Sequence, residues 1–428
     1  MWSTMKKAIL VTLNSDTVEI EALMASLDYR VIERFTQQRE KPDVNTYVGR
    51  GKIDEIKDFL EKNKDVDVVI VDGELKPSQW FNLEKETKRE VYDRTRLILA
   101  LFAERAESME AKLQVKLAQL QYERPFVREL IHRARAGEHP GFMAGGEYQV
   151  DDYYEMIKRQ MKQTREKLEK LRESRELRRK HRYEAGFYLI ALAGYTNAGK
   201  SSLLNLLTDE QVRVEEMLFS TLSPTTRRVS KKRFSETTKP PLLLTDTVGF
   251  IRDLPSWVID AFHSTLEEIA VADLILLIID VSDPVEEIQV KLQTSLRELR
   301  EISAQPPVVL VFNKMDLVDK NMLDEKLNRL KNLIAGMPHV CISVSSGLNI
   351  DKLIEIISKN LPSLVEAKLV LPFTKEAQRF VSTLYGKAWV LNVDYSDKIR
   401  VDLAINQRIF DKVTSMCSRL GGRVYTAK

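Results

Sequence analysis

The sequence contains few cysteines and lacks both long apolar segments and the features of a signal peptide. Its two cysteines, Cys341 and Cys417, lie far apart and without metal-ligand spacing, which excludes a disulfide framework and is typical of a reducing compartment. No apolar run approaches the roughly 18 residues that span a bilayer. The first residues lack the apolar core of a signal peptide. We therefore expect a soluble, cytoplasmic protein without membrane insertion.

Histidine is scarce and net charge is small. The five histidines do not cluster in the sequence, so we expect no metal site built by protein side chains alone. The 66 lysines and arginines nearly balance the 63 acidic residues, which leaves a formal charge of +3. Any affinity for nucleic acid must therefore come from local basic patches. A length of 428 residues predicts two to four domains.

Residues 194–201 read Gly-Tyr-Thr-Asn-Ala-Gly-Lys-Ser and match the phosphate-loop pattern G-x-x-x-x-G-K-[ST] at every fixed position. An apolar strand is expected before the loop, at 187–193, and a helix after it. The backbone amides of such a loop and the helix N-terminus bind phosphate. We expect Lys200 to reach the β- and γ-phosphates and Ser201 to bind Mg²⁺. The predicted nucleotide contacts here are Gly194, Tyr195, Thr196, Asn197, Ala198, Gly199, Lys200, Ser201 and Ser202.

Two further motifs each follow an apolar strand. Asp246-Thr-Val-Gly249 follows 242–245, and its aspartate can hold the Mg²⁺ shell through water while the Gly249 amide senses the γ-phosphate. Asn313-Lys-Met-Asp316 follows 308–312, so we expect Asn313, Lys314 and Asp316 at the nucleotide. Asp316 can accept hydrogen bonds from guanine N1–H and the 2-amino group. Adenine offers neither donor, and leaving the carboxylate unpaired would cost several kcal/mol.

A fourth motif, Ser343-Val-Ser-Ser346, follows a short strand and is expected to pack over the base through Ser345 and Ser346. Either this motif or Asp246–Gly249 alone is weak. All four in this order, each at a strand end, are specific for a GTP-binding domain.

The segment 218–226 is where a switch must supply a threonine to Mg²⁺ and the γ-phosphate. Thr221 and Thr225 are both candidates, and we slightly favour Thr221. An antiparallel edge hairpin is expected to begin at Arg227. The predicted metal ligands are Ser201, Thr221, Thr225 and Asp246, and the predicted catalytic residues are Lys200, Thr221, Thr225 and Gly249. Phe250 occupies the position at which small G proteins carry a water-positioning glutamine. We therefore expect slow intrinsic hydrolysis.

The pattern of apolar residues divides the chain into four parts and predicts an α/β protein. Residues 1–95 alternate strands and helices, which predicts a mostly parallel sheet. Residues 96–182 are expected to form a long antiparallel helical hairpin with a glycine-rich loop, 183–361 the phosphate-loop domain, and 362–428 a small α+β module. The glycine turn at 49–51 lacks G-K-[ST], and we assign no second nucleotide site to it.

The hairpin is expected to contain a helix from Thr95 with a break at Pro125, a loop at 137–147 and a second helix at 152–181. The second helix carries an apolar stripe of Ile157, Met161, Leu168, Leu171 and Leu177. Its basic residues form either a solvated face, balanced by nearby glutamates, or an RNA-phosphate surface. Arginines around the mobile glycines favour RNA. The candidates are Arg124, Arg128, Arg133, Arg135, Arg175, Arg178, Arg179 and Arg182.

These residues also carry a family resemblance. The blocks at 47–52, 93–106, 110–122, 218–225 and 246–251 resemble the HflX family of ribosome-associated, translation-factor-related GTPases, over nearly the whole chain. The resemblance implies a GTP- and Mg²⁺-dependent protein that binds the large ribosomal subunit, with its N-terminal and helical parts near the peptidyl-transferase region. It further implies a link to splitting or rescuing ribosomes under stress, with hydrolysis stimulated by the ribosome. The loop departs from the family's Gly-Pro-Gly-Glu-Thr pattern, because here it reads Ala144-Gly-Gly-Glu-Tyr-Gln149.

Two hypotheses from different classes follow. The first is a GTPase, expected to be monomeric, that hydrolyses GTP to GDP and phosphate and changes state on the large ribosomal subunit. The alternative is an RNA- or protein-binding module in which the nucleotide is a structural or regulatory ligand. A role in regulating membrane-bound proteolysis is disfavoured by the lack of a membrane segment.

Overall fold

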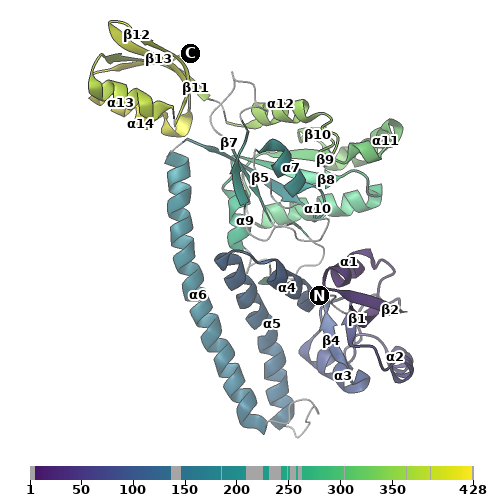
Figure 1. The fold of residues 1–428 in the computed structure, drawn as a ribbon. Helices are drawn as coiled ribbons and strands as arrows, with labels where there is room; N and C mark the ends of the chain where they lie inside the picture. The colour runs from purple at the N-terminus through teal and green to yellow at the C-terminus, as the bar shows by residue number, and fades with distance from the viewer. Residues whose placement is uncertain are drawn as a thin grey trace. The chain divides into compact units, whose positions relative to one another are not determined.

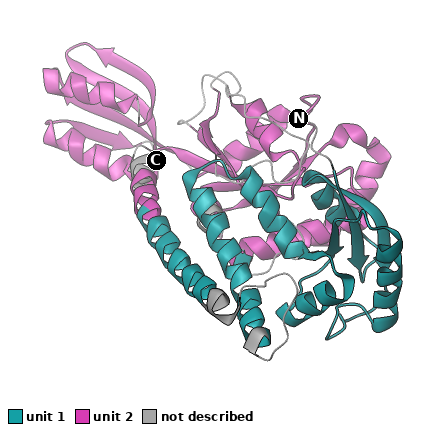
Figure 2. Ribbon diagram, turned by 60° about the horizontal axis from the view of Figure 1, so that its bottom comes forward, with its two compact units in different colours: residues 1–170, 217–222, 253–262 teal, residues 171–216, 223–252, 263–428 magenta. Residues whose placement is uncertain are grey.

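The computed structural model describes residues 5–135, 146–184, 186–208, 225–230, 242–247, 249–250, 257–258, 263–302, 304–362, 364–385 and 387–426. These residues form two compact units (Figure 2). One contains the described residues up to Lys170 together with Trp257 and Val258, and the other contains the rest. Within the described ranges, no helix combines the length and apolar composition that crossing a membrane requires.

The N-terminal part contains a four-stranded parallel sheet in the order β2-β1-β3-β4 (Figure 1). Its elements are β1 (Lys6–Thr12), α1 (Val18–Ser26), β2 (Tyr29–Thr36), α2 (Arg50–Lys62), β3 (Val68–Val71), α3 (Pro77–Thr87) and β4 (Glu90–Asp93). The predicted parallel sheet is confirmed. Strand β4 was not predicted, because its four residues contain a single buried aliphatic side chain, Val91.

Three helices follow this sheet: α4 (Arg94–Arg105), α5 (Met109–Arg135) and α6 (Gly146–Glu184). Asp93 caps α4, since its carboxylate accepts a hydrogen bond from the Arg96 backbone N–H at 2.8 Å. The helical pattern predicted from Thr95 therefore belongs to two helices, and Ser108 accepts from the Ala111 N–H at the start of α5.

The predicted break at Pro125 is wrong, because α5 continues through it. Proline in a helix interior costs about 3 kcal/mol. Here the helix is held on both sides of the proline by packing, since Leu117, Leu120, Val127 and Ile131 of α5 share one apolar cluster with α6.

The helical hairpin is confirmed, with α5 and α6 side by side (Figure 1). Ile157 and Met161 of α6 are buried in the shared cluster, and Leu168 is partly buried against it. Leu177 does not continue the stripe, since it is 61% exposed. The predicted loop at 137–147 lies outside the described residues up to 145, but from Gly146 onward the backbone is already helical.

The phosphate-loop domain contains a six-stranded sheet in the order β10-β9-β8-β5-β7-β6, in which β6 alone is antiparallel. Its elements are β5 (Tyr188–Gly194), α7 (Lys200–Leu207), β6 (Thr225–Arg228), β7 (Leu242–Asp246), α9 (His263–Ala270), β8 (Leu274–Asp280), α10 (Val285–Glu301), β9 (Val308–Asn313), η1 (Met315–Leu317), α11 (Lys320–Ile334), β10 (His339–Cys341) and α12 (Ile350–Asn360). The antiparallel pairing of β6 with β7 confirms the predicted edge hairpin. The four sequence motifs follow β5, β7, β9 and β10. Because these strands are parallel, the motifs meet at the carboxyl edge of the sheet.

The C-terminal module has a βαββαβ order and an antiparallel sheet, β12-β13-β11-β14, as in ferredoxin-like folds. Its elements are β11 (Leu364–Pro372), α13 (Lys375–Leu384), β12 (Trp389–Tyr395), β13 (Lys398–Asn406), α14 (Gln407–Arg419) and β14 (Arg423–Thr426). The predicted α+β class is confirmed, and β14 is an additional short edge strand.

Candidate nucleotide-binding site

The phosphate loop requires its two glycines. Gly194 and Gly199 have φ angles of 137° and 97°, in the region that side chains disfavour. A Cβ atom at Gly194 would lie 2.3 Å from the Ile278 carbonyl oxygen, and one at Gly199 would lie 2.2 Å from Asn313 Nδ2. The loop therefore packs directly against β8 and against the Asn313 motif, as a narrow anion-binding turn must.

Lys200 begins helix α7 and is buried. Its ammonium donates hydrogen bonds to the carbonyl oxygens of Gly194 at 3.0 Å and Tyr195 at 2.7 Å. Burial lowers the pKa of this ammonium from 10.5 to about 8, and Asp246 only partly offsets the effect. A phosphate oxygen next to this ammonium would restore its preference for the charged form, so the lysine fits a phosphate ligand.

Ser201 and Asp246 meet although 45 positions separate them in the sequence. The serine hydroxyl donates to Asp246 Oδ2 at 2.6 Å, and both side chains are buried. Hydroxyl and carboxylate oxygens are donors that Mg²⁺ prefers, so this pair fits that ion. Thr225 lies beside Asp246 in the β6–β7 ladder, whereas Thr221 lies outside the described residues.

Phe250 is hydrogen-bonded to the phosphate loop, and Gly249 lies close against the loop. Phe250 donates its N–H to the Gly194 carbonyl at 3.0 Å and accepts from the Thr196 N–H at 3.2 Å. A Cβ atom at Gly249 would lie 2.9 Å from Lys200 Nζ. Phe250 is only 6% exposed. Gly249 therefore lies close to Lys200, and the side chain at 250 belongs to the core.

Asn313 holds the motif at 313–316, predicted to read the base, to the phosphate loop. Its amide nitrogen donates to the Ala198 carbonyl at 2.9 Å, and its amide oxygen accepts from the Val344 N–H at 3.1 Å. This side chain thus links three of the four sequence motifs.

Asp316 and the serine motif at 343–346, which are predicted to contact the base, lie together. Ser345 donates to Asp316 Oδ2 at 3.1 Å, and hydrogen bonding from Ser343, foremost, holds the pKa of the Asp316 carboxyl below its usual value. The Ser346 N–H donates to Ser343 Oγ at 3.2 Å. Ser343 is fully buried and organises the turn, a role that the sequence reading missed although the residue opens the motif. The Asp316 carboxylate is exposed, so its oxygens are open to a hydrogen-bond donor.

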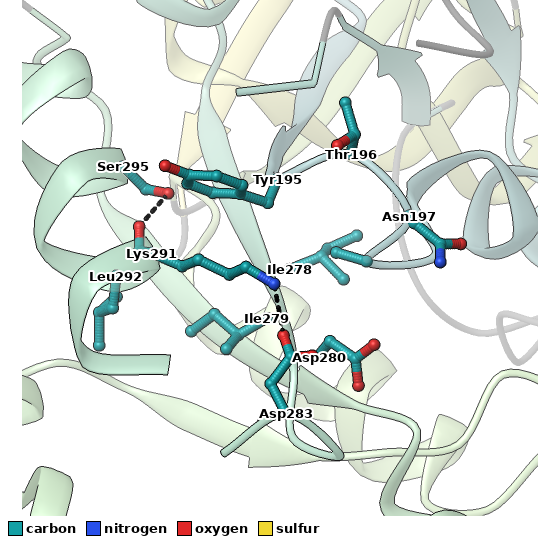
Figure 3. Close-up of a pocket in the computed structure, with 11 residues that line it drawn as sticks. Tyr195, Thr196, Asn197, Ile278, Ile279, Asp280, Asp283, Lys291, Leu292 and Ser295 are labelled. Atoms are coloured by element: carbon teal, nitrogen blue, oxygen red, sulfur yellow. Dashed lines mark hydrogen bonds and ion pairs between the residues drawn. The ribbon is translucent and has the colours of Figure 1, made fainter. Parts of the chain in front are cut away.

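Residues Tyr195–Ala198 also line a cavity of about 80 Å³ beside the loop (Figure 3). Across it lie Asp280, which ends β8, Asp283 in the loop that follows, and Lys291 of α10. Asp280 was not predicted as a site residue, yet its carboxylate lies 2.5 Å from the Lys314 ammonium. Ser202 lies half-buried in the first turn of α7.

The eight candidate RNA-binding arginines have different environments. Arg175 and Arg179 are engaged inside the protein, because they pair with Glu267 at 3.2 and 3.4 Å, and Arg179 also pairs with Glu268 at 3.0 Å. Arg133 pairs with Glu129 on its own helix. The exposed members of the set are Arg124, Arg128 and Arg178. The side chains of Arg135 and Arg182 lie outside the described part of the structure.

The described parts of the chain contain no group of histidine, cysteine and acidic side chains arranged to hold a metal by themselves. The parallel sheet, the phosphate loop on β5, the Ser201–Asp246 pair and the Asn313/Asp316 base site define the class of the protein. It is a phosphate-loop protein built for a guanine nucleotide.

Comparison with known proteins identifies the family. The model of the 50S ribosome-binding GTPase family matches residues 189–314, and the models described as GTP-binding GTPase N-terminal and Middle Region match 14–103 and 105–182. The GTPase HflX of Thermococcus kodakarensis is 40% identical over 93% of this chain and 90% of its own length. That of Methanocaldococcus jannaschii is 41% identical over 81% and 84%. The chain belongs to the HflX family of GTPases and contains its GTP-binding domain.

Among solved structures, the complex of SsGBP with GDP aligns with 83% of this chain and 99% of that one, with 27% identity and a TM-score of 0.48. The structure of Era from Aquifex aeolicus bound to GDP and AlF4⁻ aligns with 41% of this chain and 57% of that one, with 24% identity and a TM-score of 0.34.

Proposed function

We propose that this protein hydrolyses GTP to GDP and phosphate in a Mg²⁺-dependent reaction that the large ribosomal subunit stimulates. We further propose that its biological role is the splitting or rescue of ribosomes under stress. The observation that carries the coupling to a partner is the burial of Phe250 beside the phosphate loop. In this proposal the residue after Gly249 cannot orient an attacking water, so the partner must supply that function.

The contacts of the chain's own residues support the roles that we propose for them. The loop amides and Lys200 bind the phosphates, and Asp316 with Ser345 reads the guanine edge. Ser201 and Asp246, with a switch threonine at 221 or 225, would hold Mg²⁺. When bound, that ion would neutralise charge on the phosphate oxygens. Gly249, next to Lys200, is placed to sense whether a γ-phosphate is present.

A small free-energy difference between the GTP-bound and GDP-bound states is enough to control binding to a partner. A γ-phosphate that biases two states of the protein by ~3 kcal/mol changes the affinity for a partner about a hundred-fold. In this proposal GTP orders the segments around Thr225 and Gly249 and favours ribosome binding. Hydrolysis relaxes them and releases the subunit.

Two observations support the ribosomal partner. The family model that matches the GTP-binding domain describes a 50S ribosome-binding GTPase. Arg124 and Arg128 are exposed four residues apart on α5, so they share one face of that helix. Together with Arg178 of α6, they are the side chains that we propose for phosphate contacts on ribosomal RNA. Arg175 and Arg179 are not included, because they already form ion pairs with glutamates of α9.

The test is GTP turnover with and without purified large ribosomal subunits at two salt concentrations. We expect at least ten-fold stimulation by the subunits. If the protein makes three phosphate contacts, raising the salt concentration from roughly 50 to 200 mM should weaken binding to the subunit about 30-fold. The double variant Arg124→Gln/Arg128→Gln should lose much of the stimulation and part of the salt dependence. Arg297→Gln is the matched control, since Arg297 is a similarly exposed arginine on α10.

Absence of stimulation, with tight GTP binding retained, would overturn the coupled-GTPase proposal. It would favour the alternative, in which the protein is an RNA- or protein-binding module with nucleotide as a structural ligand. Salt-sensitive RNA binding that is the same with GTP, with GDP and without nucleotide would point to that module.

A further inference from the structure

Asp280 ends strand β8 at the carboxyl edge of the sheet. Its carboxylate is 13% exposed and lies 2.5 Å from the ammonium of Lys314, in the base-reading motif. The other carboxylate oxygen accepts from the Ser282 N–H at 3.0 Å and from the Ser282 hydroxyl at 2.5 Å. One oxygen thus holds the local turn, and the other is directed to Lys314.

The sheet brings these two residues together. Asp280 is the register partner of Asn313 in the β8–β9 ladder, and Val281 donates its N–H to the Asn313 carbonyl at 3.0 Å. Lys314 follows Asn313 with a left-handed φ of 64°. Its side chain therefore reaches from the end of β9 to the end of β8. The next strand in the sheet is β5, which carries the phosphate loop.

The loop after β8 is itself rigidly held. Lys326 of α11 donates to the carbonyl oxygens of Val281 at 2.8 Å and Asp283 at 2.7 Å. Lys291 of α10 pairs with Asp283 at 2.7 Å. Figure 3 shows Asp280 and Asp283 on the side of the cavity opposite Tyr195 and Thr196 of the phosphate loop. Asp280 is therefore a fixed anchor rather than a mobile surface carboxylate.

We propose that Asp280 is a positioning residue for the bound guanine nucleotide, acting through Lys314, and that it sets how long the nucleotide stays bound. The inference rests on the proposed nucleotide contact of Lys314. A lysine without an anchor loses rotamer freedom when it is fixed against a ligand. The ion pair fixes the stem of Lys314 before the nucleotide arrives, so less freedom is lost on binding.

The experiment measures dissociation of a fluorescent GDP analogue, and of a non-hydrolysable GTP analogue, from the full-length protein. Asp280→Asn keeps an oxygen for the Ser282 turn but removes the charge that holds Lys314. We expect both dissociation rates to rise about ten-fold. Asp283→Asn is the matched control, because it removes the same charge from the same loop at a carboxylate paired with Lys291. It should change the rates less than two-fold.

A double-mutant cycle with Lys314→Met distinguishes a purely structural role for Asp280 from a role that acts through Lys314. This substitution keeps the aliphatic stem of the lysine and removes its ammonium. Asp280→Asn should add less than two-fold to the rates of Lys314→Met. An equal effect in both backgrounds, or an effect no larger than that of Asp283→Asn, would overturn the inference. If the Asp280→Asn protein is poorly folded, Asp280→Ser, which also removes the charge, takes its place in the same cycle. If Lys314→Met itself leaves dissociation unchanged, the proposed contact of Lys314 fails, whereas the ribosome coupling is judged separately by turnover.

Discussion

Nucleotide binding at pH 8 should draw a proton onto the protein, and Lys200 is the group that takes it up. Without a ligand, burial lowers the pKa of Lys200 from 10.5 to about 8. At pH 8 about half of the molecules then carry a neutral amine at this position. The phosphates of GDP raise the pKa of the neighbouring ammonium again. We therefore expect uptake of about 0.5 proton per GDP bound at pH 8, and of about 0.1 at pH 7.

The same shift has a consequence for stability. The folded, nucleotide-free protein binds this proton less tightly than the unfolded chain does. Its free energy of unfolding should therefore rise between pH 8 and 10.5, by about 3 kcal/mol if the shift is fully expressed. Below pH 8 the cost of burying the ammonium is present in full, and bound nucleotide relieves it. Nucleotide should thus stabilise the protein more at pH 7.5 than at pH 9.5.

Proton uptake is measured by calorimetry of GDP binding in buffers with different ionisation enthalpies. At pH 8 the phosphates are already ionised, since their second pKa is about 6. Lys200→Met keeps the aliphatic stem, and we expect it to bind GDP weakly and without proton uptake. Tight binding by the unmodified protein with no proton uptake at pH 8 would refute the assignment of Lys200 as a buried, phosphate-neutralised ammonium.

Four further substitutions have defined outcomes. Asp316→Asn should shift preference from GTP to XTP in competition binding, and unchanged GTP selectivity would show that another group reads the base. Gly199→Ala should weaken GDP binding at least ten-fold, because the new Cβ atom would lie 2.2 Å from Asn313 Nδ2 and would push that side chain away. Near-native affinity would refute this prediction. Phe250→Gln should lower the free energy of unfolding by about 2 kcal/mol, because it places an amide in a buried position. Since the side chain at 250 is buried, this variant should not hydrolyse GTP rapidly in single-turnover assays. Fast turnover without ribosomes would contradict this explanation. Glu268→Gln should cost about 1.5 kcal/mol in chemical denaturation, because Arg179 loses its closest charged partner and keeps Glu267. No loss would show that the pair is energetically neutral.

The phosphate loop illustrates how much local sequence can predict. Its glycines, lysine and serine are contiguous, and an apolar strand and a helix flank them, so the pattern alone indicated the loop, the phosphate ligand and the parallel sheet. The four motifs were also indicated as one site, because parallel strands place their carboxyl ends at one edge. Their individual roles toward the nucleotide stay predictions.

Errors arose where packing outweighed a local rule. Pro125 predicted a helix break, but apolar contacts on both sides keep α5 continuous. Leu177 fitted the three- and four-residue spacing of the stripe, yet it is exposed because the cluster shared with α5 includes only residues up to Leu168. Strands β4 and β14 have four residues each, too few for a period-two pattern to stand out.

The sequence by itself determined the class of this protein, because the chemistry of phosphate and guanine recognition is carried by short contiguous motifs whose backbone geometry is local. Tertiary structure alone decided which distant charges meet. It paired Arg175 and Arg179 with the glutamates of α9, and it placed Asp280 beside Lys314 through strand register. Composition shows only that such charges exist. Their partners depend on which elements pack together, and burial then makes those pairs energetically significant.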